Sequence, residues 1–386
     1  MLKILHTGDL HLGSPFTGLP LRDAEERRAH QLDTFRRMID RAGEEAVDLF
    51  LIAGDLFDSP TVPSAVSDAV FDALEELDCP VVIAPGNHDP YRHGSPYDSD
   101  ALPGNVFVFR SESLDRFSFP ELGNGVDVFG YAFRDATLTP SPLESAPDQS
   151  CLGDGLSILL AHGDLDLPLS VYAPIRTADV ERCGADYVAL GHVHNTGESI
   201  RFVGDSAVAY CGFPEGRSFD ECGFGGYWLL TFDESPGMAH PLVRSERVRA
   251  SAHRYALDRV DLSGVDSDPA AAERIRAYLS SVGYGAETAL RLTLEGEVAL
   301  RYTPDAGAIL STLRSALPDA VPSPLLLLDR TLPILDAAYL ERDPTIRGAV
   351  YRLLKPRLLS GTPEERSTAA EALRVALAAL DGRAIL

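Results

Sequence analysis

The stretch Ile4-Leu5-His6-Thr7-Gly8-Asp9-Leu10-His11-Leu12-Gly13 decides the fold. An apolar run that begins at Leu2 predicts a buried strand, which ends at Gly8. Asp9 and His11 follow the strand end, one residue apart, and a carboxylate and an imidazole delivered by one sharp turn suit a borderline divalent metal. Such pairs also occur in ordinary loops, so the assignment depends on whether the arrangement recurs along the chain.

After this stretch the chain alternates between helices and strands. Apolar residues at helical spacing predict amphipathic helices over 21–46 and 64–77, and apolar runs at 47–53 and 80–84 predict the second and third strands. A β-α-β-α-β order favours a parallel sheet with helices on its faces, so the predicted fold class is α/β.

Three domains are expected. The first, 1–250, continues with a helix at 175–183 and with strands at 106–109, 126–131, 156–161, 186–190, 200–211, 226–232 and 241–248. A small α+β domain over 251–332 is predicted from strands at 255–262, 288–295 and 324–329 and helices at 269–282 and 304–317. The last segment, 333–386, is predicted to be helical at 336–340, 347–359 and 363–380, with Thr362 as the N-cap of the final helix.

Composition indicates a globular protein: 386 residues, 45% hydrophobic and 24% charged, allow two or three domains with one large core. The sequence contains no apolar run of 18 or more residues, and Met1 leads directly into a strand, so we expect no membrane span, no signal peptide and a cytoplasmic location. The five cysteines, at 79, 151, 183, 211 and 222, lack a paired spacing and are predicted to be free thiols.

The net charge is −24, from 34 basic and 58 acidic residues. A field of this sign repels nucleic acid, so a DNA substrate would require local positive charge or a partner. An arginine-favouring or high-salt proteome is the alternative explanation of the composition.

Polar side chains recur directly after four later strands: Asp55 with Asp58, Asn87 with His88, His162, and His192 with His194. Sites in open α/β sheets form beyond the carboxyl ends of the strands, so we expect these clusters to converge. Two carboxylates, one amide oxygen and four imidazoles, with His88 left over, are too many ligands for one metal ion. Two ions about 3.5–4 Å apart can use them if they share a bridging carboxylate.

In this order the residues resemble the five motifs of the calcineurin-like metallophosphoesterases: Asp9-x-His11, Gly54-Asp55-x-x-Asp58, Gly86-Asn87-His88-Asp89, His162 and Gly191-His192-x-His194. The resemblance covers roughly residues 1–232. The stretches 51–58, 86–97 and 212–219 are similar to DNA-repair exonucleases of the SbcD type, and especially to their YhaO-like subgroup.

The resemblance implies an architecture and a partner. Its β-sandwich core is flanked by helices in a four-layer arrangement, 251–332 would be a capping domain, and the helical tail would dock the coiled-coil base of an SbcC-like ATPase. It also allows a homodimer.

The resemblance further implies metal ligands and catalytic residues. Asp9, His11 and His194 would hold one metal ion, Asn87, His162 and His192 a second, and Asp55 would bridge them. His88 and Asp89 would belong to the catalytic set, with His88 contacting the scissile phosphate and protonating the leaving oxygen. Asp89 and Asp58 would orient imidazoles. Mixed carboxylate and imidazole ligation fits two Mn²⁺ ions, with Fe or Zn as alternatives.

Two residues outside the motifs, Arg217 and His93, are candidates for substrate contact. Arg217 lies in the glycine-rich loop 212–219, where structural ion pairing is the alternative, and His93 lies in the loop that follows His88. His6, inside the first strand, is expected to be a core histidine. The basic run at 27–41 contains interleaved acidic residues and is expected to be a solvated face rather than a DNA track.

Together these features predict a metal-dependent DNA exonuclease or endonuclease subunit that acts in repair and recombination with an SbcC-like ATPase. One alternative is a phosphodiesterase or phosphatase for small molecules or phosphoproteins with the same metal centre. The other is a non-catalytic scaffold that binds DNA ends or the ATPase.

Overall fold

The computed structural model describes residues 1–17, 20–99, 102–145, 155–195, 199–233, 235, 240–317, 320–380 and 382. The chain divides into two compact units, Met1–Ala252 and His253–Leu386. Cys151 lies outside the described residues, and the other four cysteines are free thiols, as expected. Within the described ranges, no helix is long and apolar enough to cross a membrane.

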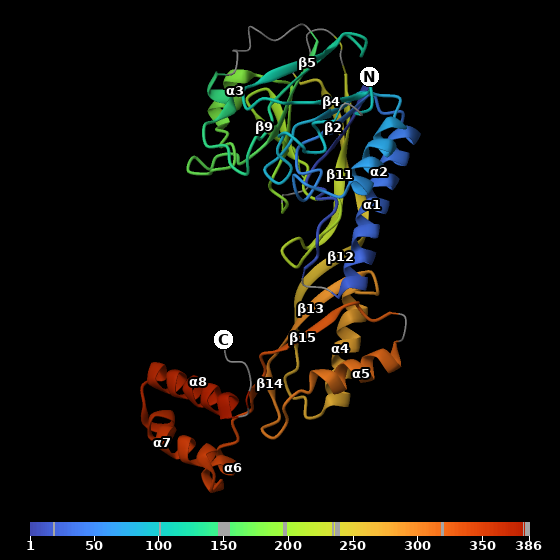
Figure 1. The fold of residues 1–386 in the computed structure, drawn as a ribbon. Coiled ribbons are helices and arrows are strands. Elements are labelled where there is room, and N and C mark those ends of the chain that lie inside the picture. The colour runs from blue at the N-terminus through green and yellow to red at the C-terminus, as the bar shows by residue number, and fades with distance from the viewer. Residues whose placement is uncertain are drawn as a thin grey trace. The chain divides into compact units, whose positions relative to one another are not determined.

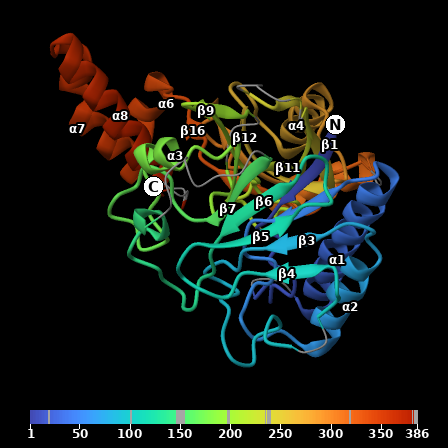
Figure 2. The same cartoon turned by 90° about the horizontal axis from the view of Figure 1, so that it is seen from above.

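Two β-sheets form the centre of the first unit (Figures 1 and 2). In one sheet the strand order is β11 (Gly223–Phe232), β1 (Leu2–Thr7), β2 (Leu49–Ile52), β3 (Val81–Ile83) and β4 (Val106–Val108). In the other it is β5 (Asp115–Phe119), β6 (Val126–Gly130), β7 (Leu156–His162), β8 (Tyr187–Gly191), β10 (Ser206–Tyr210) and β9 (Arg201–Val203). Strands β1 to β4 are parallel, as are β6, β7, β8 and β10. Strand ends that precede motif residues therefore point the same way within each sheet.

The two sheets pack face to face because their strands are apolar on both sides. In β2, Leu51 belongs to a buried cluster with Ile158 of the other sheet. Its neighbour Phe50 points to the opposite face and belongs to a second cluster. Since side chains alternate along a strand, a continuously apolar parallel strand must be covered on both faces.

Helices cover the outer face of each sheet. α1 (Leu21–Glu44) and α2 (Ser64–Glu75) contribute Phe35 and Leu74 to the cluster that contains Phe50. α3 (Thr177–Cys183) and the 3-10 helix η1 (Pro142–Ser145) contribute Val180 and Leu143 to a cluster on the second sheet. The layers run helix, sheet, sheet, helix, which confirms the predicted α/β fold class.

The second unit has its own buried core, built on parallel strands. β12 (Leu242–Asp261) begins in the first unit and pairs in parallel with β13 (Thr288–Glu295), which pairs in parallel with β15 (Leu325–Asp329). α4 (Asp268–Val282) and α5 (Ala306–Ala316) cover this sheet through a buried cluster that includes Ile275, Leu292 and Leu313.

Short elements complete the second unit. β14 (Glu297–Val298) pairs with β16 (Leu332–Pro333). A small buried cluster that includes Leu373 is enclosed by three helices, α6 (Ala337–Arg342), α7 (Ile346–Ser360) and α8 (Pro363–Leu380). Thr362 caps α8 as predicted, because its Oγ1 accepts a hydrogen bond from the Glu365 amide at 3.2 Å. The Glu365 carboxylate accepts one from the Thr362 amide at 2.8 Å, which completes a capping box.

Apart from the short elements η1, β14 and β16, which the sequence analysis does not predict, two strands differ from the sequence prediction. β12 is one strand of 20 residues, although the pattern predicts separate strands at 241–248 and 255–262. At the expected break, Ser251 is buried and its hydroxyl accepts a hydrogen bond from the Gly225 amide at 2.9 Å. β5 has no counterpart in the prediction, because this edge strand is largely polar and exposed and is defined by its pairing with β6.

Candidate metal centre

The loops after β1 and β2 run side by side and carry the first motif residues. The amides of Asp9 and His11 donate hydrogen bonds to the carbonyl oxygens of Gly54 at 3.0 Å and Asp55 at 2.9 Å. Asp9, His11 and Asp55 have φ values of 49°, 48° and 48°. This left-handed conformation costs a non-glycine residue about 1–2 kcal/mol. Strain held in place by surrounding structure is typical of functional sites.

Glycines allow the strand ends to approach one another. A Cβ atom on Gly191 would lie 1.8 Å from the carbonyl oxygen of Ala53, and one on Gly54 would lie 2.3 Å from the His162 ring. Both distances are far shorter than a van der Waals contact, so a larger residue would push the loops apart. These two motif glycines therefore have a steric role in bringing β2, β7 and β8 together.

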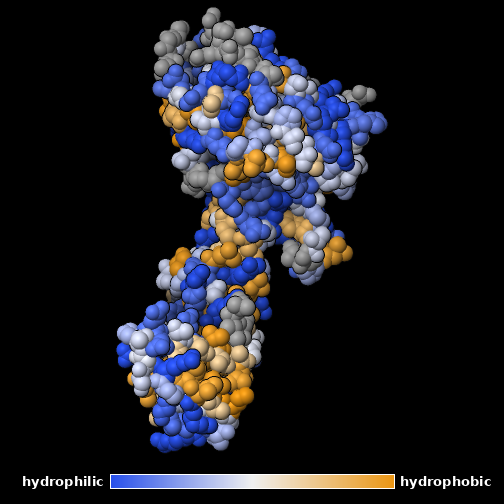
Figure 3. Space-filling view, turned by 90° about the vertical axis from the view of Figure 1, so that its left-hand side faces the viewer, coloured by the Kyte–Doolittle hydropathy of each residue, from blue (hydrophilic) through white to orange (hydrophobic). Residues whose placement is uncertain are grey.

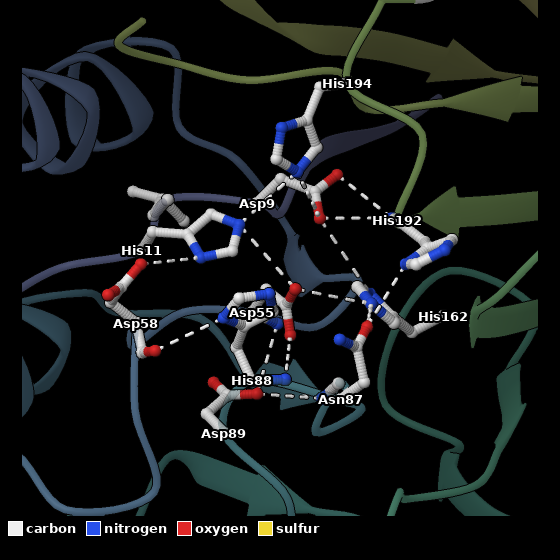
Figure 4. A network of polar contacts seen from close by, with 12 residues as sticks. Asp9, His11, Asp55, Asp58, Asn87, His88, Asp89, His162, His192 and His194 are labelled. Atoms are coloured by element: carbon white, nitrogen blue, oxygen red, sulfur yellow. Dashed lines mark hydrogen bonds and ion pairs between the residues drawn. The ribbon is translucent and has the colours of Figure 1, made fainter. Parts of the chain in front are cut away.

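The first group of potential ligands is Asp9, His11 and His194, whose ligand atoms lie within 4.8 Å of one another (Figure 4). The Nε2 atoms of His11 and His194 are 3.3 Å apart, and His194 Nε2 lies 3.6 Å from Asp9 Oδ1. Asp9 and His11 are buried and His194 is half-buried. The structure thus brings together the three residues predicted for the first metal.

The second group gathers on the other side of Asp55 (Figure 4). His162 Nε2 lies 2.9 Å and His192 Nδ1 lies 3.1 Å from Oδ1 of Asn87. Asp55 Oδ2 lies 3.5 Å from His162 Nε2 and 3.6 Å from His11 Nε2. This oxygen therefore lies between a nitrogen of the first group and one of the second, where a bridging ligand would be needed.

The outer nitrogen of each imidazole faces an oxygen. His194 Nδ1 lies 2.8 Å from Glu221 Oε1, His162 Nδ1 lies 2.9 Å from the Ala53 carbonyl oxygen, and His11 Nδ1 lies 3.3 Å from Asp58 Oδ1. His192 Nε2 lies 3.7 Å from Asp164 Oδ2. An oxygen at the outer nitrogen favours the tautomer that carries its proton there, which leaves the inner lone pair for a metal. This donor set fits two divalent cations.

The electrostatics of Asp9 and His192 favour the charge states that metal ligands need. Burial opposes ionisation of Asp9, but His194, His162 and His11 hold the pKa of its carboxyl well below the usual range. Burial, aided by His162, lowers the pKa of His192 to about 4, which keeps this imidazole neutral. Carboxylate and neutral imidazole are the metal-binding forms. Burial opposes the charge of His194, but hydrogen bonds to Asp9 and Glu221 raise the pKa of this imidazole to about 10, so a metal ion would have to displace its proton.

His88 lies beside the first group and is exposed. Its amide donates a hydrogen bond to Asp55 Oδ1 at 2.9 Å, and its Nδ1 lies 3.3 Å from the carbonyl oxygen of Asp58. The ring meets the His11 ring edge to face, with 4.7 Å between centroids. With Nδ1 at a backbone oxygen, Nε2 is the nitrogen of His88 that can serve a substrate.

Asp89 does not have the predicted place beside an imidazole. Its buried carboxylate accepts hydrogen bonds from the amides of Gly86 at 2.8 Å, Phe57 at 3.0 Å and Asp55 at 3.2 Å, and from the hydroxyl of Tyr97. The orientation of Asp89 toward these donors follows from the turn at 86–89, which folds back over the loop after β2. Asp89 therefore organises the backbone around Asp55.

Arg217 lies in ion pairs at the edge of the site. Its Nη1 donates to Asp58 Oδ1 at 2.9 Å, and its Nη2 donates to Glu221 Oε1 at 2.7 Å. Burial opposes the charge of Glu221, but His194 and Arg217 lower the pKa of this carboxyl to about 2. The sequence analysis did not identify Glu221. The available signal was the presence of an acidic residue four positions after Arg217, which could form an ion pair with it.

Two other histidines lie apart from both ligand groups. His93 is fully exposed and its Nδ1 lies 2.8 Å from Asp98 Oδ2. His6 is buried with its Nδ1 2.8 Å from the Tyr187 hydroxyl, and burial lowers its pKa to about 3, as suits a neutral core histidine. A further contact that the sequence did not indicate is that of Cys211, whose thiol lies 3.3 Å from Asp9 Oδ2.

A pocket of about 470 Å³ opens beside the two ligand groups. It is lined by His192, His194, Arg217 and the acidic residues Asp164, Asp220 and Glu221, together with Val193, Asn195 and Ser218. A ligand in this pocket would reach an imidazole of each group. Its acidic lining disfavours an anion unless cations are present.

Comparison with known proteins places the motif region in one family and identifies similar sequences. The family model for calcineurin-like phosphoesterases matches residues 2–196, about half of the chain. The metallophosphoesterase YhaO of Bacillus subtilis is 30% identical over 238 residues, which are 59% of this chain and 57% of that protein.

Two archaeal proteins named as DNA double-strand break repair protein Mre11 are also similar. The one from Aeropyrum pernix is 32% identical over 242 residues, 57% of this chain and 55% of that protein. The one from Saccharolobus solfataricus is 30% identical over 251 residues, 61% of each chain. The chain thus matches little more than half of the length of these relatives.

Proposed function

This chain belongs to the calcineurin-like phosphoesterase family, and we propose that it hydrolyses phosphodiester bonds in DNA with two divalent metal ions, Mn²⁺ by preference. The observation that carries the proposal is the position of Asp55 Oδ2, at 3.6 Å from a nitrogen of one ligand group and 3.5 Å from a nitrogen of the other. A single ion would leave one of the two groups unused. When bound, the ions would supply Lewis acidity, both to activate water and to offset charge on the phosphoryl oxygens.

The side chains around the ions would hold and orient the substrate. Two divalent cations against Asp9 and Asp55 give a formal local charge of about +2, which would attract a phosphate within a protein of net charge −24. Repulsion from the remote acidic surface is screened over about 8 Å at physiological salt. His88 would donate a proton from Nε2 to the leaving oxygen, since its Nδ1 already faces the Asp58 carbonyl oxygen.

DNA is proposed as the substrate because two relatives are named for repair of DNA double-strand breaks. The test is to strip the full chain of metal with EDTA, restore Mn²⁺, and measure nucleotide release from linear duplex DNA at low and physiological salt. Bis-p-nitrophenyl phosphate is the parallel substrate, and His88→Ala is the matched control. Mn²⁺-dependent DNA cleavage that is lost in the control supports the proposal, and hydrolysis of the small ester alone refutes it.

A phosphodiesterase for small molecules is the second candidate. The observation that favours it is the acidic lining of the pocket by Asp164, Asp220 and Glu221, together with the net charge of −24. This candidate predicts that cleavage of the small ester is insensitive to salt while DNA binding is weak. A non-catalytic scaffold has no use for two complete ligand groups with His88 beside the first of them.

We also propose that the C-terminal helices dock an SbcC-like coiled-coil ATPase. Figure 3 shows hydrophobic residues on the surface of this segment, and Ile346 and Leu353 of α7 are 63% and 78% exposed. Their spacing of seven residues places them on one face of the helix, as a coiled-coil partner would require. Co-elution with such an ATPase should be lost in Leu353→Asp, whereas binding that survives this change would refute the assigned surface.

A further inference from the structure

We propose that Arg217 is a positioning residue for the first metal site, formed by Asp9, His11 and His194. It would act by holding the two carboxylates that orient His11 and His194. The inference rests on the proposed two-metal function and extends it to a residue outside the family motifs.

A closed ring of contacts carries the inference. Asp58 Oδ1 lies 3.3 Å from His11 Nδ1, and Glu221 Oε1 lies 2.8 Å from His194 Nδ1. Arg217 joins these two carboxylates through Nη1 at 2.9 Å and Nη2 at 2.7 Å. The ring closes where the Nε2 atoms of His11 and His194 face each other at 3.3 Å, beside Asp9 (Figure 4).

Arginine suits this position because of its planar fork. Its Nε also lies 3.1 Å from Glu221 Oε1, and its amide donates to Glu221 Oε2 at 2.7 Å, so each of the three guanidinium nitrogens faces a carboxylate. A lysine ammonium is a point charge on a flexible stem and would hold two carboxylates less rigidly. A substrate phosphate would have to compete with both carboxylates for this guanidinium.

Because the ring of contacts is largely buried, it is sensitive to the loss of the Arg217 guanidinium. The side chains of Arg217, Asp58 and Glu221 are 21%, 18% and 6% exposed. Removing one partner of a largely buried ion pair leaves charge uncompensated. Here it would leave two carboxylates that repel each other, each of which faces an imidazole of the same metal site.

The second metal site has different supports, so the effect should be selective. His162 Nδ1 faces the backbone oxygen of Ala53 at 2.9 Å, and His192 Nε2 lies 3.7 Å from Asp164. The described contacts of Arg217 do not include these groups. Loss of the guanidinium should therefore weaken the binding of the ion at the first site and leave the binding of the other ion unchanged.

The experiment is a calorimetric titration of the metal-free full chain with Mn²⁺, accompanied by absorption spectra of the Co²⁺-loaded protein. Arg217→Gln should weaken one of two sites about 10–100-fold, the size found for groups that support metal ligands, and should alter the Co²⁺ spectrum. Arg217→Lys should bind Mn²⁺ at this site more tightly than Arg217→Gln but less tightly than the wild type. Arg27→Gln is the control, since Arg27 anchors the same loop through the Gly216 carbonyl oxygen at 2.6 Å and is similarly buried.

Unchanged binding at both sites in Arg217→Gln would overturn the inference, and a raised KM for DNA would then identify Arg217 as a substrate contact. An equal loss in Arg27→Gln would also overturn it, because the loop alone would explain the effect. If Arg217→Gln does not fold, the Arg217→Lys variant provides the test. Native Mn²⁺ affinity in that variant would show that the planar guanidinium is not required and would refute the inference. The titration requires no turnover, so a wild type that binds two ions without cleaving DNA refutes only the proposed function.

Discussion

Replacing Asp55 with Asn would remove the negative charge at the centre of the site while keeping its shape. Asp55 Oδ2 lies 3.6 Å from His11 Nε2 and 3.5 Å from His162 Nε2, so an ion held by either imidazole lies near this oxygen. Two unit charges about 4 Å apart interact by about 4 kcal/mol at an effective dielectric constant of about 20. Since about 1.4 kcal/mol is a factor of ten and Mn²⁺ carries two charges, we expect Mn²⁺ binding to weaken at least about a thousandfold at one site or more.

The assay is equilibrium dialysis against Mn²⁺ followed by metal analysis, with circular dichroism to verify the fold. Asn at this position still offers an oxygen to the His88 amide, which lies 2.9 Å from Asp55 Oδ1. Asp58→Asn is the matched control because Asp58 faces the outer nitrogen of His11, and it should cost only about 10–100-fold at one site.

The order of the two effects tests the reasoning. If Asp55→Asn binds two ions with nearly native affinity, or if Asp58→Asn is the more damaging change, Asp55 does not bridge. The two-metal arrangement would then have to be abandoned.

Four further outcomes are expected. His88→Ala should lower turnover about 10²–10⁴-fold with both Mn²⁺ ions retained, by rate measurement and metal analysis, and loss of metal would contradict its role as a proton donor. Burial raises the pKa of Glu215 from an ordinary 4.5 to about 7, although Arg27 lies 3.6 Å away. The folded state therefore binds a proton more tightly than the unfolded state, and the free energy of unfolding falls as pH rises from about 4.5 to about 7. In urea unfolding, the free energy of unfolding of the wild type should fall between about pH 5 and pH 8 by about 2 kcal/mol more than that of Glu215→Gln. Equal falls in the two proteins would contradict the raised pKa of Glu215. EDTA should lower Tm, since an ion present at about 100 times its Kd stabilises the folded state by about 2.7 kcal/mol, and an unchanged Tm would argue against bound metal. Thr362→Ala should cost about 1 kcal/mol in urea unfolding without changing Mn²⁺ affinity, and no cost would show that the capping box with Glu365 is not stabilising.

The amino-acid sequence alone was sufficient to predict the strands and helices of the first unit and the convergence of its motifs, whereas the packing of two sheets was expected only from the family resemblance. Both depend on local patterns: a continuous apolar run such as Leu49–Ile52 must be buried on both faces, and a glycine at the strand end permits the following turn. Parallel strands then bring their carboxyl ends to one edge, so residues as distant as Asp9 and His194 could be expected to lie together.

Tertiary structure alone decided how the surrounding side chains are used. Asp89 and Asp58 follow their strands in similar ways, yet one binds backbone amides and the other faces His11. Arg217 could be assigned to a phosphate from its loop, but its partner Asp58 lies 159 residues away in the chain. The physical reason is that spacing and periodicity report on neighbours along one element, whereas an ion pair between loops depends on how complete sheets pack.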